Sequence, residues 1–143
     1  MTKRLLFLCT GSSCRSQMAE GWARCLHGDK FEVHSAGMQP RGLHPLAVLV
    51  MKEAGVDISA QASKPVRALK NIDFDFVITL CDSARESCPL FPKKTKVVHR
   101  DFEDPAAAKG SEEEVLAAFR RVCGQIHDFV EGLPEILMTE DRP

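Results

Sequence analysis

The chain has 143 residues, of which 44% are apolar and 27% are charged, and its formal net charge is -1. A chain of that length can bury an adequate core as one domain, and a near-neutral charge gives no basic footprint for nucleic acid or a membrane surface. Its longest apolar runs, 5–9 and 46–51, are too short to span a bilayer. We therefore expect one domain over residues 1–143, with no nucleic-acid or membrane partner.

Short apolar runs of strand type alternate with stretches of helical periodicity along the chain. The run that ends at Leu80 is mostly apolar and does not alternate in polarity, as expected of a central parallel strand. The predicted strands cover 4–9, 31–36, 74–80 and 96–99. The predicted helices cover about 16–26, 45–54 and a last segment from 112 onward, and residues 139–143 are expected to fray.

Local signals mark where these helices begin and end. Ser16 is the predicted N-cap of the first helix, Gly55 follows the second, and Ser111 forms a capping box with Glu114 in the last. Apolar spacings of three and four residues define the buried faces. These faces comprise Met18, Ala19, Trp22 and Leu26 in the first helix, and Val115, Phe119, Val122, Ile126 and Phe129 in the last.

Strands separated by helices predict an α/β fold, namely a single-domain open sheet of four parallel strands with helices on both faces. Ligands bind such sheets at the carboxyl ends of the strands. Cys9 ends the first predicted strand and Cys81 follows the third. We therefore expect both sulfur atoms at the same edge of the sheet.

Six cysteines are many for a chain of this length. The N-terminal residues are interpreted as a buried strand and not as an export signal, so we expect a cytoplasmic protein with reduced thiols. Clustered thiols in that compartment are typically catalytic or metal-binding. Zinc is disfavoured, because the spacings of Cys9 to Cys14 and of Cys81 to Cys88 are not those of paired zinc knuckles. We therefore expect no metal.

The strongest chemical signal is the segment from Cys9 to Ser16. Five small or polar residues connect a cysteine at a strand end to Arg15 at a helix start, and they are Thr10, Gly11, Ser12, Ser13 and Cys14. Backbone N–H groups of such a loop can surround a tetrahedral oxyanion, and the helix N-terminus and the arginine fork add attraction. We predict oxyanion binding by residues 10–16, with an incidental serine-rich turn as the alternative.

The same positive surroundings should lower the pKa of the Cys9 thiol. Ser16 can also donate a hydrogen bond to the sulfur. A lowered pKa would make Cys9 largely a thiolate at neutral pH and therefore a nucleophile.

The stretch from Cys9 to Trp22, CTGSSCRSQMAEGW, resembles the anion loop of thioredoxin-coupled arsenate reductases, which share the fold of low-molecular-weight protein tyrosine phosphatases. The resemblance covers nearly the whole chain and continues through 35–37, 77–81, 88–89 and 102–106. The loop pattern alone fits both families. The pair Cys81 and Cys88 favours the reductase.

The resemblance implies a reaction in which three cysteines act in turn. Cys9 would attack arsenate, with Asp104 as general acid, and water would leave to give a thiol-arsenate adduct. Cys81 would attack Cys9 and release arsenite, and Cys88 would then attack Cys81 and carry the disulfide to the surface. Thioredoxin would supply the reducing equivalents, so no bound cofactor is implied. We expect a monomer.

Two other functions fit these residues. A low-molecular-weight tyrosine phosphatase would use Cys9, Arg15 and Asp104 but neither Cys81 nor Cys88. It would hold a phenol ring with aromatic side chains, whereas this chain has no Tyr and only one Trp beside its eight Phe. Weak residual activity on aryl phosphates would still follow from the shared anion chemistry. A thiol sensor would keep the cysteines without turning over arsenate.

The segment between Cys81 and Cys88 is polar and can form a helix in the reduced protein. Seven residues of helix span about 10.5 Å, whereas a disulfide needs Cα atoms within about 7 Å. A bond between these two cysteines would therefore require a local rearrangement if the segment is helical.

The remaining cysteines are expected to lie outside the relay. Cys14 is predicted to have a structural or protective role. Cys25 and Cys123 lie on or beside apolar helix faces, which predicts core packing.

Two positions depart from the family pattern. Ser12 stands where the family usually carries Asn, and a serine can brace the loop with fewer hydrogen bonds. Lys64 stands where some members carry an Asp that helps to bind potassium. We expect its ammonium group to pair with Glu20 in place of that cation, with little potassium dependence.

Overall fold

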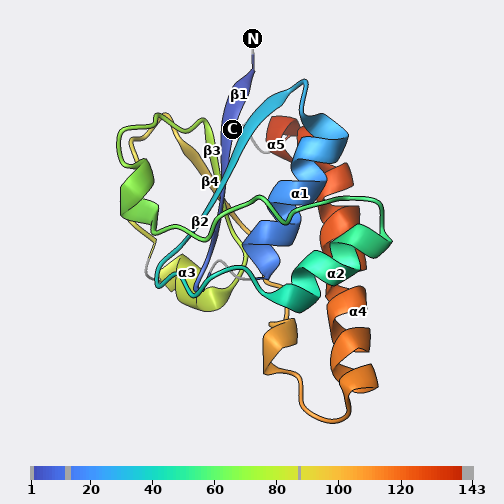
Figure 1. Cartoon of the computed structure of the whole chain (residues 1–143). Helices are drawn as coiled ribbons and strands as arrows, with labels where there is room; N and C mark the ends of the chain where they lie inside the picture. The colour runs from blue at the N-terminus through green and yellow to red at the C-terminus, as the bar shows by residue number, and fades with distance from the viewer. Residues whose placement is uncertain (1, 12–13, 87, 140–143) are drawn as a thin grey trace.

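Four parallel strands form one sheet in the computed structural model of the chain, which describes residues 2–11, 14–86 and 88–139, with side chains as far as residue 137. The strands are β1 (Lys3–Cys9), β2 (Phe31–Gly37), β3 (Phe76–Thr79) and β4 (Lys96–His99). Their order is β2-β1-β3-β4, and each neighbouring pair is parallel. The predicted α/β fold is confirmed (Figure 1).

Helices cover both faces of this sheet unequally (Figure 1). One face carries α1 (Arg15–His27), α2 (Pro45–Glu53), α4 (Glu112–Glu131) and α5 (Leu133–Thr139). The other carries the short α3 (Asp82–Glu86) and a 3₁₀ turn, η1 (Val66–Leu69). A second 3₁₀ turn, η2 (Pro105–Ala107), precedes α4.

The central strand β1 is buried from both sides. Leu5 and Phe7 belong to the larger apolar cluster beneath α1, α2 and α4, whereas Leu6 and Leu8 belong to the smaller cluster beneath α3 and η1. All four side chains are fully buried. Apolar residues in an unbroken run are therefore what a strand covered on both faces requires.

Of two predicted helix N-termini, one is confirmed and the other is corrected. Ser16 is not the N-cap of α1, because the Met18 amide already donates to the Cys14 carbonyl at 2.9 Å and the helix begins at Arg15. The capping box is confirmed, since the Glu114 amide donates to Ser111 Oγ at 3.2 Å and the Ser111 amide donates to Glu114 Oε1 at 3.3 Å.

Two boundaries differ from the predictions. β3 is shorter than the predicted 74–80, although the amides of Asp75 and Leu80 still bond to β1, each at 2.9 Å. The last helical segment is two helices, because α4 ends at Glu131, Gly132 is its C-cap, and α5 begins at Leu133. Of the predicted fraying segment, residues 140–143 lie outside the described residues. No helix among the described residues is both long and apolar enough to cross a membrane.

Candidate active site

The carboxyl ends of β1 and β3 bring Cys9 and Cys81 together, as the sheet topology predicted. Leu8 pairs with Thr79 in the parallel register, and the Leu80 amide donates to the Leu8 carbonyl at 2.9 Å. Cys9 and Cys81 are both buried, and their side chains share a hydrogen bond. Two sulfur atoms that are 72 residues apart in sequence therefore meet at one edge of the sheet.

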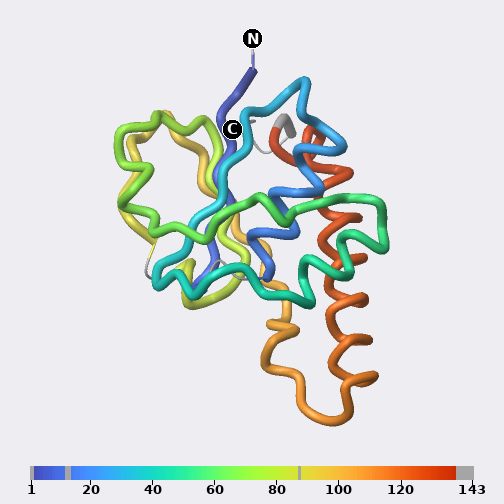
Figure 2. Tube along the Cα trace, in the orientation of Figure 1, coloured from blue at the N-terminus to red at the C-terminus, as the bar shows by residue number. Residues whose placement is uncertain are grey.

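The segment after β2 holds the start of the anion loop in place. The amides of Met38, Gln39 and Arg41 donate to the carbonyls of Cys9, Thr10 and Gly11 at 3.1, 2.8 and 2.9 Å. Figure 2 shows this segment running beside the end of β1. In a trans peptide the N–H points opposite to the C=O. The Thr10 and Gly11 amides therefore point away from this segment and are available to an anion.

Arg15 is the cation at the base of the loop. Its side chain is only 10% exposed, and Nη1 donates to the Phe102 carbonyl at 3.0 Å. Nη2 lies 3.9 Å from Asp104 Oδ2, and the buried Nε has no hydrogen-bond partner among the described residues. Burial opposes the charge, but the nearby Cys9, Cys81 and Asp104 outweigh it and raise the pKa of Arg15. The guanidinium is therefore charged and held in place, and its Nε still lacks a hydrogen-bond acceptor among the described residues.

Cys81 lies in surroundings that favour a thiolate. A side-chain hydrogen bond with Cys9 lowers the pKa of Cys81 to about 5, against the opposing effect of burial. Thr10 Oγ1 at 3.3 Å, the Ala84 amide and Arg15 act in the same direction. The lowered pKa predicted for Cys9 stays a prediction, but the pair as a whole is built to carry one negative charge.

Cys88 lies in a different environment. It is partly buried, and burial raises the pKa of its thiol. It packs against the smaller apolar cluster, to which Cys9 and Cys81 also belong. The predicted helix between the two distal cysteines is α3, in which the Arg85 amide donates to the Cys81 carbonyl at 3.1 Å.

Asp104 has two contacts, one to the backbone and one to the site. Oδ1 accepts a hydrogen bond from the Ala106 amide at 3.0 Å and caps η2, as its Asp-Pro turn predicts. Oδ2 faces Arg15, and the side chain lines the pocket. The turn therefore holds the carboxylate at the pocket, facing Arg15.

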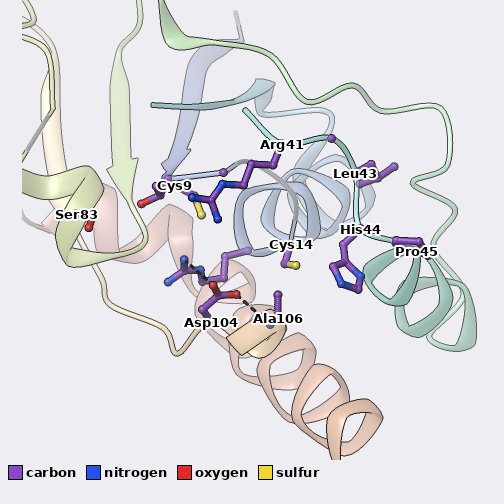
Figure 3. Close-up of a pocket in the computed structure, with 13 residues that line it drawn as sticks. Cys9, Cys14, Arg41, Leu43, His44, Pro45, Ser83, Asp104 and Ala106 are labelled. Carbon is purple, nitrogen blue, oxygen red and sulfur yellow. Dashed lines mark hydrogen bonds and ion pairs between the residues drawn. The ribbon is translucent and has the colours of Figure 1, made fainter. Parts of the chain in front are cut away.

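A pocket of about 480 Å³ opens beside Cys9 (Figure 3). It is lined by Cys9, Thr10, Gly11, Cys14, Arg15, Arg41, Gly42, Leu43, His44, Pro45, Ser83, Asp104 and Ala106. Most of the predicted anion-binding residues are therefore brought together here. Ser16 is fully buried in the first turn of α1 and is not a lining residue. Ser12 and Ser13 lie outside the described residues.

Sequence reasoning missed Arg41 and His44 on the opposite wall. Figure 3 shows the Arg41 side chain directed toward Cys9 and His44 beside Cys14. His44 Nδ1 accepts a hydrogen bond from the Leu46 amide at 3.0 Å, and the His44 ring packs on Phe119 with ring centroids 4.8 Å apart. No local motif marks either residue, but both follow the carboxyl end of β2, where the sheet rule places ligands.

A polar bridge ties α3 to the end of β4. Thr79 Oγ1 lies 2.8 Å from His99 Nδ1, and His99 Nε2 lies 3.1 Å from Asp82 Oδ1. Asp82, His99 and Asp101 also place one potential metal ligand atom each within 4.8 Å of one another. Both carboxylates are exposed, an arrangement that is common without a metal, and we assign the group to the bridge.

The predicted pairing of Lys64 with Glu20 is wrong. Lys64 Nζ donates to the Ala62 carbonyl at 3.2 Å. Glu20 instead accepts from Arg24 at 2.8 Å and from the Ser35 hydroxyl. Arg24 lies one helical turn after Glu20 on α1, which is the nearest place for a cation.

All six cysteines are present as thiols. Cys14 is buried and lines the pocket, and the buried Cys123 thiol donates to Met51 Sδ at 3.5 Å, so core packing is confirmed for Cys123. Cys25 is exposed, which corrects the prediction that it packs in the core. It lies at the edge of the apolar face of α1, where helical spacing alone does not separate packed from exposed positions.

Comparison with known proteins agrees with this architecture. The chain matches the family model described as low molecular weight phosphotyrosine protein phosphatase over residues 4–142. It is 48% identical over 133 residues to an arsenate reductase of Bacillus licheniformis, covering 93% of this chain and 96% of that protein. It is 50% identical over 124 residues to an arsenate reductase of Bacillus subtilis, covering 87% and 89%.

Solved structures give the same picture. An arsenate reductase in its oxidised state aligns with a TM-score of 0.80 at 36% identity, covering 92% of this chain and 96% of that one. A low molecular weight protein tyrosine phosphatase from T. tengcongensis aligns with a TM-score of 0.74 at 28% identity, covering 94% and 99%. The chain therefore belongs to the low-molecular-weight phosphotyrosine protein phosphatase family. Within that family, the two Bacillus relatives named above are arsenate reductases.

Proposed function

We propose that this protein reduces arsenate to arsenite through a thiol-arsenate adduct on Cys9 and a disulfide relay from Cys9 to Cys81 to Cys88. The observation that carries the proposal is the hydrogen bond of the Cys81 side chain with that of Cys9, which lines the pocket. A phosphatase needs the first sulfur only. A reductase needs a second sulfur within reach of the first, because two thiols supply the two electrons when one disulfide forms.

In the first step Cys9 would attack arsenic. The Thr10 and Gly11 amides and Arg15 would hold the oxyanion, and Asp104 would give its proton to the departing oxygen, which leaves as water. The fork of Arg15, with Nε lacking a partner among the described residues, supports this assignment.

In the second step the Cys81 thiolate would attack the Cys9 sulfur. The sulfur–arsenic bond breaks, its electron pair passes to arsenic, and arsenite leaves. The pKa of Cys81, lowered to about 5 by its bond with Cys9, supports a role as attacking thiolate at neutral pH.

In the third step Cys88 would attack the Cys81 sulfur and release Cys9 as a thiolate. Burial holds the pKa of Cys88 above its usual range in the reduced protein. Its attack would therefore follow a rearrangement of α3 that exposes the thiol and shortens its path to Cys81. Thioredoxin would then reduce the Cys81–Cys88 disulfide in the cytoplasm.

The alternative function is a tyrosine phosphatase that uses Cys9, Arg15 and Asp104, and the family match favours residual activity of that kind. The lining of the pocket favours the reductase. Its described residues include no Phe, Tyr or Trp that would stack on a phenol ring.

One assay separates these functions. Arsenate is supplied with thioredoxin, thioredoxin reductase and NADPH, and the wild type is compared with Cys88→Ser. Cys25→Ser is the matched control, because Cys25 is exposed on α1 and lies outside the pocket lining. We expect many turnovers for the wild type and the control. Cys88→Ser should release at most one arsenite per chain and accumulate a Cys9–Cys81 disulfide.

The proposal fails if Cys88→Ser turns over like the wild type. It also fails if the wild type hydrolyses aryl phosphates but forms no arsenite. That second result would leave the phosphatase as the function of the site.

A further inference from the structure

Arg41 occupies a defined position at the pocket although its side chain is exposed. Its amide donates to the Gly11 carbonyl at 2.9 Å, so its Cα is tied to the anion loop itself. The next residue, Gly42, has φ +88, a left-handed conformation that glycine adopts without strain. The chain therefore turns sharply just after Arg41.

The side chain of Arg41 points into the pocket and not toward an acidic neighbour. Figure 3 shows its guanidinium directed toward Cys9, across the pocket from Asp104. It forms no ion pair with any other residue that the structure describes, whereas Arg120 and Arg121 each clasp a glutamate with two nitrogens. An arginine held at an anion pocket without a carboxylate keeps its donors for a ligand.

The balance of charge in the pocket favours a second cation beside Arg15. Arg15 faces the thiolate pair of Cys9 and Cys81 and also the carboxylate of Asp104. One cation thus meets two negative groups before any substrate enters, and a doubly charged oxyanion adds more negative charge. Among the described lining residues, Arg41 is the second arginine, and its charge balances the pocket.

We propose that Arg41 is a second substrate-binding arginine, which donates to an outward oxygen of the oxyanion while Arg15 and the loop amides hold the inner ones. The inference rests on the proposed oxyanion chemistry of the site. Arg15 is rigid and part of the loop, whereas Arg41 sits on the adjoining segment at the mouth. Arg41 therefore acts on capture and affinity, and it takes no part in the thiol exchange.

The test uses inorganic phosphate, which has the shape of arsenate but accepts no electrons from thiols. Its dissociation constant is measured by calorimetry for the wild type, Arg41→Ala, Arg41→Lys and Arg67→Ala. Arg67 is an exposed arginine on η1, outside the pocket lining, so its substitution makes the same change in net charge. The same four proteins are assayed for arsenate KM and kcat.

We expect Arg41→Ala to weaken phosphate binding about tenfold and to raise the arsenate KM by a similar factor at unchanged kcat. Arg41→Lys should keep part of the affinity, because it keeps the charge but loses the planar fork. Arg67→Ala should bind like the wild type. Equal phosphate affinities for Arg41→Ala and Arg67→Ala would overturn the inference.

The two proposals fail separately. A wild type that makes no arsenite but binds phosphate through Arg41 would refute the reductase and leave the second arginine in place. A wild type that makes arsenite with the same KM as Arg41→Ala would refute the second arginine alone.

Discussion

The hydroxyl of Thr10 lies 3.3 Å from the sulfur of Cys81. The first residue of the anion loop therefore contacts the second cysteine of the proposed relay, and anion binding and thiol exchange share one hydrogen-bond network. A hydroxyl that donates to a thiolate stabilises the charged form. This contact links the loop that would hold the oxyanion to Cys81, whose attack on Cys9 would release arsenite.

Replacing Thr10 by valine should raise the pKa of Cys81 above its value of about 5, because the side-chain hydrogen bond is lost while size and branching are kept. Since a thiolate is the reactive form, site-resolved alkylation of the wild-type Cys81 should stay near its plateau from pH 8 down to about pH 6. In Thr10→Val the rate should begin to fall at a higher pH. Thr10→Ser keeps the hydroxyl and should follow the wild type, and matching profiles for Thr10→Val would exclude the contact as a cause.

Asp104 can be separated into its two roles by a pair of substitutions. Asparagine keeps an oxygen for the Ala106 amide but has no proton to give, whereas alanine loses both functions. Asp104→Asn should therefore retain the stability of the protein and lower kcat/KM for arsenate by about a hundredfold or more. Asp104→Ala should lose as much activity and also about 1 kcal/mol of unfolding free energy, because the cap is gone. Urea unfolding and steady-state kinetics measure the two effects, and full activity in Asp104→Asn would remove the residue from the acid role.

The helix α3 should be lost or reorganised when Cys81 bonds to Cys88. In the reduced protein the Arg85 amide is bonded to the Cys81 carbonyl, and Asp82 is held by His99. A disulfide that brings the two Cα atoms within about 7 Å is incompatible with a continuous helical path between them. Amide exchange across residues 82–86 should therefore be at least tenfold faster in the disulfide form than in the reduced form, while β1 keeps its protection.

The matched control for this experiment is Cys88→Ser carrying a Cys9–Cys81 disulfide, whose short connection does not cross α3. Its amides in 82–86 should exchange like those of the reduced wild type. Equal exchange in all three forms would mean that α3 does not move.

The sheet and most of the site followed from the sequence because each depends on local patterns. Unbroken apolar runs identify strands buried on both faces, and parallel strands place their carboxyl ends at one edge, so Cys9 and Cys81 could be paired in advance. The anion loop could also be predicted from the sequence, because small residues and an arginine at a helix start are local features.

What the sequence did not reveal depends on contacts between distant segments. Arg41 and His44 belong to the pocket only because segment 38–41 lies along the anion loop through backbone bonds, which no side-chain pattern encodes. The cation beside Glu20 is Arg24 and not the predicted Lys64, because the position of Lys64 in a loop depends on contacts between distant segments. Core packing was wrongly predicted for Cys25, because its exposure depends on which distant segment packs against the edge of α1.

Glu20 and Arg24 should respond unequally to substitution, because they are buried to different degrees. The Glu20 side chain is 4% exposed and the Arg24 side chain is 56% exposed. Arg24 also donates to the Val33 carbonyl at 2.8 Å and so connects α1 to β2. Removing Arg24 leaves a buried carboxylate with the Ser35 hydroxyl as its remaining described partner, whereas removing the charge of Glu20 leaves a cation that water can reach.

Arg24→Ala should therefore lower the free energy of unfolding by about 3 kcal/mol, and Glu20→Gln by about 1 kcal/mol. The double variant should be more stable than Arg24→Ala alone, because the uncompensated charge is then absent. Urea denaturation of the four proteins at one pH gives these differences. The exposed pair of Arg120 and Glu53 serves as the control cycle, for which the coupling should be much smaller. A larger loss for Glu20→Gln than for Arg24→Ala would show that burial does not determine the asymmetry.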